Sequence, residues 1–138
     1  MLNYREDYFL DELIGNDENC YSIKRLYDED DALAAIQVLN AKDRIYKCLF
    51  YEEGTRLSNL TIYNTETGRE IKNITYRNDG KTISSIREYN LETEKLLSVT
   101  FYKEDGQSPS SIIEYNDKGD EASFTLFCEN GQTITQAI

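Results

Sequence analysis

Seven aromatic residues recur at an almost constant interval in this chain, and this repeat constrains the fold more than any other sequence feature. Each one ends a short segment rich in β-branched residues and precedes a turn-forming sequence. A strand of about seven residues followed by a turn of about six accounts for such an interval without a helix. The intervals are 12, 13, 13, 13, 13 and 12 residues, between Tyr51, Tyr63, Tyr76, Tyr89, Tyr102, Tyr115 and Phe127.

Two types of turn alternate after these aromatic residues. One type contains Asp-Gly or Asn-Gly, which provide the positive φ angles that tight hairpins require. The other is longer and begins with asparagine, so that one complete hairpin takes 26 residues. The repeat predicts strands at Leu57–Tyr63, Ile71–Tyr76, Ile83–Tyr89, Leu96–Tyr102, Ser111–Tyr115, Ala122–Phe127 and Gln132–Ile138.

Apolar residues do not alternate perfectly within these strands. Ile71, Ile74 and Tyr76, for example, cannot all point to one face of a regular strand. Spacing of this kind predicts β-bulges or strong twist.

The N-terminal part follows a different pattern. Residues Tyr4–Ile14 are predicted to form a short amphipathic helix, and Cys20–Tyr27 alternates like a strand. The acidic run Asp28–Asp31 is then expected to open a second helix, because acidic side chains stabilise a helix N-terminus. This helix would carry an apolar stripe and cover the first strands; the stripe is Leu33, Ile36 and Leu39.

The predicted fold class is therefore α+β, mostly β: a twisted up-and-down antiparallel meander with one or two N-terminal helices. We expect one domain over residues 1–138. Residues 1–44 would form the helix–strand–helix portion and residues 45–138 the repeat meander, which begins with the strand Ile45–Tyr51.

Antiparallel strands of equal length bring like positions of the repeat into line. Tyr63, Tyr89 and Tyr115 would then lie at one end of the sheet, on strands of the same sense roughly 9–10 Å apart. Glu88 and Glu114 each precede one of these tyrosines. We predict these five residues as partner-binding, with the alternative that the tyrosines only pack the repeat and the glutamates form a surface ladder.

The charge of the chain bears on its partners. With 15 basic and 26 acidic residues the formal net charge is −11, which disfavours direct binding to nucleic acid or to an anionic membrane. Such a surface suits a basic protein partner, although it also serves solubility alone. The first residues contain no basic region followed by an apolar one, so we expect a cytoplasmic protein.

Several kinds of reaction chemistry lack their usual residues here. The chain has no histidine, which removes the base of Ser-His-Asp and Cys-His sites, and it has no glycine-rich phosphate loop. Its three cysteines form no CxxC pair. A carboxylate pair such as Glu88 and Glu114 is the remaining option for catalysis. We expect no enzyme activity, no catalytic residue, no cofactor and no metal site.

Two stretches carry a resemblance to known repeats, namely Tyr63-Asn64-Thr65-Glu66-Thr67-Gly68 and Thr75-Tyr76-Arg77-Asn78-Asp79-Gly80-Lys81-Thr82-Ile83. They resemble the YN-x-x-TG and Y-x-x-DGKT tandem β-repeats of uncharacterised bacterial proteins of the phytoplasma type. More loosely, they are similar to RHS-type YD repeats and to YwqK-type antitoxin components. Glu94 stands where the glycine of the first stretch would recur. The resemblance implies an architecture and a link to bacterial conflict systems, and it brings no catalytic residue.

Two functional hypotheses follow. The first is an acidic protein-binding module, an inhibitor or immunity-type protein that caps a basic toxin or nuclease; a phage-encoded inhibitor that mimics nucleic acid is a variant of it. The second is a carbohydrate-binding or scaffold repeat domain, in which rows of tyrosine stack on sugar rings. The sequence leaves the oligomeric state open, because an unpaired last strand could pair with another copy.

Overall fold

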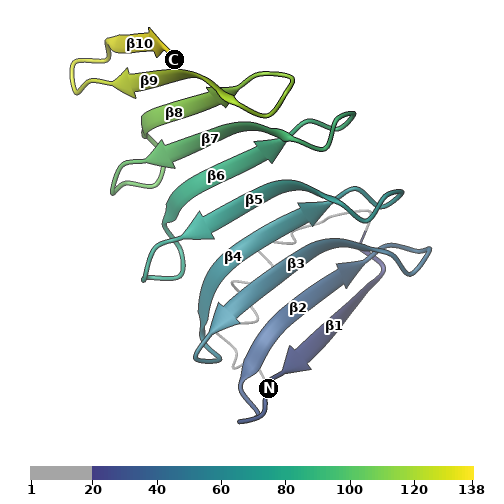
Figure 1. The fold of residues 1–138 in the computed structure, drawn as a ribbon. Coiled ribbons are helices and arrows are strands. Elements are labelled where there is room, and N and C mark those ends of the chain that lie inside the picture. The colour runs from purple at the N-terminus through teal and green to yellow at the C-terminus, as the bar shows by residue number, and fades with distance from the viewer. Residues whose placement is uncertain (1–19) are drawn as a thin grey trace.

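The computed structural model describes residues 20–138, and these form one antiparallel sheet (Figure 1). It contains ten strands: β1 (Ser22–Tyr27), β2 (Leu33–Leu39), β3 (Ile45–Glu52), β4 (Arg56–Tyr63), β5 (Glu70–Tyr76), β6 (Ile83–Tyr89), β7 (Leu96–Tyr102), β8 (Pro109–Tyr115), β9 (Glu121–Phe127) and β10 (Thr133–Ala137).

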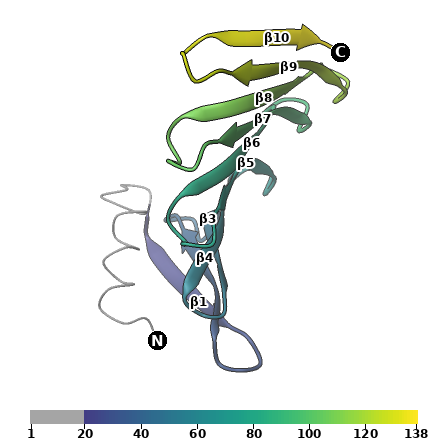
Figure 2. The ribbon, with the colours of Figure 1, turned by 90° about the vertical axis from the view of Figure 1, so that its left-hand side faces the viewer.

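The strands lie in the sheet in chain order, and each pairs only with its neighbours in sequence. Figure 2 shows the same succession from a second direction, with β1 at one end of the molecule and β10 at the other. The predicted up-and-down meander is confirmed. The predicted strands from Leu57 onward agree with the observed ones to within two residues at either end.

The α+β class is wrong for the described residues, because they contain no helix and form a sheet only. The helix expected after Asp28 is instead a turn followed by β2. Asp28 Oδ1 accepts a hydrogen bond from the backbone N–H of Asp30 (2.9 Å), as it would at a helix N-terminus, but its second donor is the N–H of Ala32 (3.0 Å), four residues on, which a helix cap does not use. Asp31 then adopts a φ of 61°, which a helix does not allow.

The apolar stripe of this segment has a second explanation. Ala35 and Ile36 are adjacent and both buried, so β2 is covered on both faces. A strand buried on both faces loses the alternation that normally distinguishes it from a helix. The other predicted helix, Tyr4–Ile14, lies outside the described residues.

β-Bulges recur at a fixed place in the repeat, as the imperfect alternation predicted. Eight of the nine strand pairs contain a register shift. In seven of them it lies where the last residue of one strand meets the start of the next, and in β3–β4 it lies one residue earlier, at Tyr51. Ile71, for example, is the extra residue opposite the step from Ile62 to Tyr63. This bulge explains why Ile71 breaks the alternation set by Ile74 and Tyr76.

Between the bulges the register is continuous, so side chains form rows that cross all ten strands. We name the two faces of the sheet by their contents in the first strands. One row of the groove face is Leu26, Ala35, Phe50, Asn59, Thr75, Ser85, Phe101, Ser111, Leu126 and Ile134. One row of the core face is Arg25, Ile36, Leu49, Leu60, Ile74, Ile86, Thr100, Ile112, Thr125 and Thr135.

The hydrophobic core lies on the core face of the first strands. Ile36, Val38 and Leu49 are fully buried there, and Tyr51 and Tyr76 pack against them from the strand ends. Beyond β6 the core-face row continues mainly with threonine. The apolar core is therefore confined to one part of the meander.

Candidate functional site

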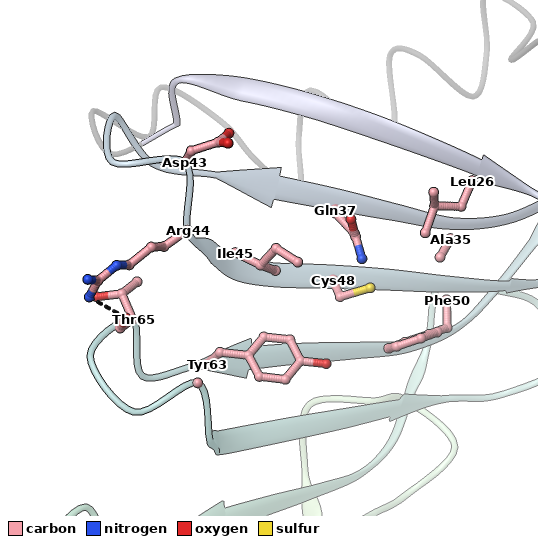
Figure 3. Close-up of a pocket in the computed structure, with 11 residues that line it drawn as sticks. Leu26, Ala35, Gln37, Asp43, Arg44, Ile45, Cys48, Phe50, Tyr63 and Thr65 are labelled. Atoms are coloured by element: carbon pink, nitrogen blue, oxygen red, sulfur yellow. Dashed lines mark hydrogen bonds between the residues drawn. The ribbon is translucent and has the colours of Figure 1, made fainter.

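The groove face of β1–β4 contains an open groove of about 500 Å³ (Figure 3). Leu26, Ala35 and Phe50 lie at one end of it, and the ring of Tyr63 lies along the other part, above the strands. Gln37 and Cys48 are neighbours across β2 and β3 and project between the two ends. The remaining lining residues are Asp43, Arg44, Ile45, Thr65 and Gly68.

Two turns close the Tyr63 end of the groove. Arg44, after the β2–β3 turn, donates a hydrogen bond from Nη1 to the carbonyl oxygen of Thr65 in the β4–β5 turn, at 3.0 Å. This bond joins turns that are 21 residues apart and leaves other guanidinium N–H donors beside the groove. The groove thus combines apolar and aromatic walls with a few polar groups, as ligand sites commonly do.

The thiol in this groove is not activated. Burial raises the pKa of Cys48 to about 11, so the sulfur stays protonated at neutral pH. Burial also raises the pKa of the neighbouring Tyr63 hydroxyl, which therefore remains a neutral hydrogen-bonding group. These groups can contact a ligand, but they do not form an ionised nucleophile.

Beyond the groove, the same face carries a polar network on β4 and β5. The side-chain amides of Asn59 and Asn73 bond to each other in both directions, at 2.9 and 2.7 Å. Asn73 also donates to the hydroxyl of Thr61 at 2.9 Å, and Thr61 donates to Asn59 at 3.0 Å. These amides therefore satisfy part of each other's hydrogen-bonding capacity within the sheet.

Farther along, the groove face becomes apolar again on β7–β10. Phe101, Phe124, Leu126 and Ile134 are 40, 38, 44 and 59% exposed. Phe101, Leu126 and Ile134 belong to one row, and Phe124 lies in the adjacent row beside Val99 and Ile113. We call these six residues the C-terminal patch.

The structure places the predicted tyrosines as a row at one end of the sheet. Tyr63, Tyr89 and Tyr115 end the same-sense strands β4, β6 and β8. Tyr63 lines the groove, and alternation along β6 and β8 puts the other two on the same face. Burial, and then a hydrogen bond with Glu70, raise the pKa of Tyr89, so part of this row is engaged within the sheet.

The two predicted glutamates fall on the opposite, core face. Glu88 and Glu114 both lie beside Ser98 in one row, two strands apart. Lys72 Nζ lies 4.0 Å from Glu88 Oε1 on an exposed surface, so this ion pair contributes little to stability. The structure therefore brings the tyrosines together and the glutamates together, but it separates the two groups.

One end of the sheet carries two acidic turns of fixed conformation, between β5 and β6 and between β7 and β8. Asp105 accepts from the backbone N–H groups of Gln107 (2.9 Å) and Ser108 (2.8 Å) and from the Ser108 hydroxyl (2.6 Å). These bonds lower the pKa of Asp105 to about 2. Asp79 makes the equivalent bonds to Lys81 and Thr82 and its pKa is likewise lowered to about 2. These carboxylates remain charged over the physiological range.

Residues 20–138 contain no cluster of His, Cys, Asp and Glu that could hold a metal ion. Within the same residues, no helix has the length and apolarity needed to cross a membrane.

The sequence reasoning missed the groove and the C-terminal patch. Gln37 lies in the segment that the sequence predicts as a helix, so its place in a row of the sheet does not follow from the sequence. In the patch the available signal was a substitution pattern: Phe101 and Leu126 stand in the row where Thr75 and Ser85 stand in earlier strands. The repeat period instead identifies the aromatic residues at the strand ends.

Solved structures with a similar fold are parts of much longer chains. The GtfA/B complex bound to UDP and GlcNAc aligns with a TM-score of 0.58 at 11% identity, over 83% of this chain and 24% of that one. A mutant of S. aureus TarM, in complex with Fondaparinux, alpha-GlcNAc-glycerol and UDP, aligns with a TM-score of 0.56 at 11% identity, over 96% and 24%. At this identity the likeness concerns the fold, and the chain spans about a quarter of either structure. No curated protein matches in sequence.

The sequence itself matches one family model twice, over residues 50–101 and 76–125. The two matches begin 26 residues apart, which is the length of one hairpin unit. Together they span residues 50–125, more than half of the 138 residues. This chain is a member of the DUF2963 family, whose description is "protein of unknown function".

Proposed function

We propose that this chain is a non-enzymatic protein-binding module that caps a basic effector, in the manner of an inhibitor or immunity-type protein. The observation that carries the proposal is the pair of fixed acidic turns, β5–β6 and β7–β8, at one end of a single sheet. Asp79 and Asp105 keep their charge because the turn itself holds each carboxylate, and the whole chain has a net charge of −11. Acidic surfaces of this kind accelerate association with basic partners.

The first experiment identifies the partner and measures how charge contributes. Proteins retained by the tagged chain from an extract of its host are identified by mass spectrometry, purified and titrated. We expect a basic protein whose association rate falls at least about tenfold from low to physiological salt. A partner that is acidic, or whose binding is indifferent to salt, would contradict the proposal.

A second experiment tests the predicted tyrosine row. Tyr89→Ala on the groove face is compared with Tyr102→Ala, which removes an equivalent strand-end ring from the other end of the sheet. If the row binds the partner, only Tyr89→Ala weakens binding, by about tenfold or more. Equal loss of stability with unchanged affinity in both variants would assign the row to packing.

A carbohydrate-binding role is the second candidate, and the groove favours it. Phe50 and Tyr63 offer aromatic surfaces, and Gln37 and Arg44 offer hydrogen-bonding groups, in a volume that suits a small ligand. The similar solved structures contain UDP and GlcNAc derivatives, although they share only the fold with this chain. A glycan array decides between the candidates. Saturable binding to a sugar that Phe50→Ala abolishes favours the carbohydrate-binding role, and the absence of binding to any sugar favours the protein-binding role.

A further inference from the structure

We propose that the C-terminal patch is the docking surface for the basic partner, and that this partner presents an apolar centre surrounded by lysine or arginine. The inference rests on the proposed function and adds the surface and its recognition chemistry. Antiparallel sheets normally cover their apolar face, and large exposed apolar side chains that gather on one face mark an interaction site. Four such side chains gather here, on β7, β9 and β10.

The faces of β7–β10 differ in a way that favours this side. The two groove-face rows across these strands hold no charged side chain and consist of Val99, Phe101, Ser111, Ile113, Phe124, Leu126, Ile134 and Gln136. The core-face rows across the same strands hold serine, threonine and Glu114 along with Ile112 and Ala137. A partner can therefore cover the patch without removing a charge from water, which it could not do on the other face.

The rim of the patch selects the sign of the partner's charge. Residues 90–138 contain nine acidic and three basic residues, a net charge of −6, and all of the acidic ones except Glu114 lie in turns or at a strand start. A second copy of the chain would bring the same acidic rim against this one, and like charges would oppose the contact. A partner with basic groups around an apolar centre is complementary in both respects.

The test uses the full chain and synthetic helical peptides of leucine and lysine. One peptide gathers its leucines on one helix face, a second has the same composition in scrambled order, and a third replaces lysine by glutamate. We expect the first to bind at least ten times more tightly than the scrambled one, and the glutamate peptide not to bind. Equal binding of the first two peptides would show that charge alone drives the interaction, and it would overturn the proposal.

Adjacent residues of the edge strand locate the contact. Ile134 lies on the groove face and Thr133 on the core face, and both are exposed. A photo-crosslinking p-benzoylphenylalanine at position 134 should capture the lysine–leucine peptide, and the same group at position 133 should not. Equal capture from both positions would overturn the assignment of the face.

Paired variants on β7 and β9 complete the test. The double variant Phe101→Ser and Leu126→Ser should weaken peptide binding at least tenfold, whereas Ser98→Ala and Ser123→Ala, on the same strands but the opposite face, should not.

Three other results would contradict part of this account. If the free chain sediments as a dimer and the patch variant sediments as a monomer, a second copy of the chain is the occupant of the patch and the proposal is overturned. If the host partner binds the patch variant with unchanged affinity, the docking surface is wrong while the proposed function stands. If no basic host partner exists, the proposed function itself fails.

Discussion

Glu94 has a backbone conformation that glycine provides in the two neighbouring turns of the same type. Its φ is +65°, beside +74° for Gly68 and +85° for Gly119. The sequence showed this position as a departure from the repeat, but the turn keeps its shape. The glutamate forms an ion pair instead: Arg69 Nε lies 3.0 Å from Glu94 Oε2. Arg69 follows the preceding turn on the same side of the sheet, so the pair joins the two turns.

Replacing this glutamate should stabilise the protein. A left-handed conformation costs a side-chain-bearing residue roughly 1–2 kcal/mol, while an exposed ion pair contributes about 0.2–1 kcal/mol. We therefore expect Glu94→Gly to raise the free energy of unfolding by about 1 kcal/mol, measured by urea denaturation. The control is Glu92→Gly in the same turn, where φ is not positive. It should lower stability by roughly 0.5–1 kcal/mol, and a loss of stability at both positions would contradict this explanation.

Asp105 should make the stability depend on pH at the acidic end. Its pKa is about 2 in the folded protein and near 3.8 without the turn, so the unfolded state binds the proton more readily. The stabilisation by the carboxylate is therefore complete above about pH 4 and is lost as the pH falls towards 2. Asp105→Asn should flatten the decrease of the urea midpoint between pH 4 and pH 2. Identical pH profiles for the two proteins would show that the turn carboxylate does not contribute.

At the scale of elements, successive turns on one side of the sheet stack on each other. A Cβ added to Gly106 would lie 2.7 Å from Thr82 Cγ2 and 3.0 Å from the backbone nitrogen of Ile83, at the start of the strand two places earlier. Arg77, at the start of the earlier turn, donates from Nη2 to the carbonyl oxygen of Tyr102 beside the later turn, at 2.8 Å. Contacts between turns therefore supplement the hydrogen bonds between strands.

Two glycine substitutions can distinguish the energy of this stacking from the backbone strain of a positive φ. Gly106 and Gly68 have φ values of +70° and +74°, but a Cβ at Gly68 would meet nothing within 4 Å. We expect Gly68→Ala to cost about 1–2 kcal/mol from backbone strain alone. Gly106→Ala should cost about 1–3 kcal/mol more, because the turn must move away from Thr82 and Ile83. Equal urea midpoints for the two variants would show that the stacking carries no energy.

The sequence predicted the strands best where turn chemistry and period agreed. From Leu57 onward both signals repeat, and the observed strands follow them. At β2 they failed for physical reasons, since an acidic residue such as Asp28 can cap a turn as well as a helix, and burial on both faces removed the alternation. The bulges could be expected in kind from Ile71, Ile74 and Tyr76, but their recurrence near the strand ends could be seen only from the register.

The candidate site was less accessible to sequence reasoning. A period locates residues along the chain, whereas a site depends on which face each residue occupies. Glu88 and Tyr89 are neighbours in sequence, so alternation places them on opposite faces. Phe101 and Leu126 are 25 residues apart in the chain, yet they belong to one row through Ser111.

At the scale of the whole molecule, buried apolar volume is unevenly distributed. The largest fully buried side chains come from β2–β4 and include Ile36, Val38, Leu49 and Leu57, whereas every residue of β10 is exposed. Local stability follows the burial of apolar groups. Hydrogen exchange should therefore show the slowest amides in β3 and β4 and much faster ones in β9 and β10. A uniform rate of exchange across the sheet would indicate one cooperative unit and contradict this gradient.

The length of the hairpin unit also determines how such a sheet could gain or lose strands. Because strand partners recur every 26 residues, copying one hairpin unit would add two strands and leave every later side chain on its original face and at its original end. Copying a single 13-residue segment would reverse the direction of everything that follows and move each later tyrosine to the other end. Duplication or loss of whole hairpins is thus the change that such a protein can accept without rebuilding its surfaces.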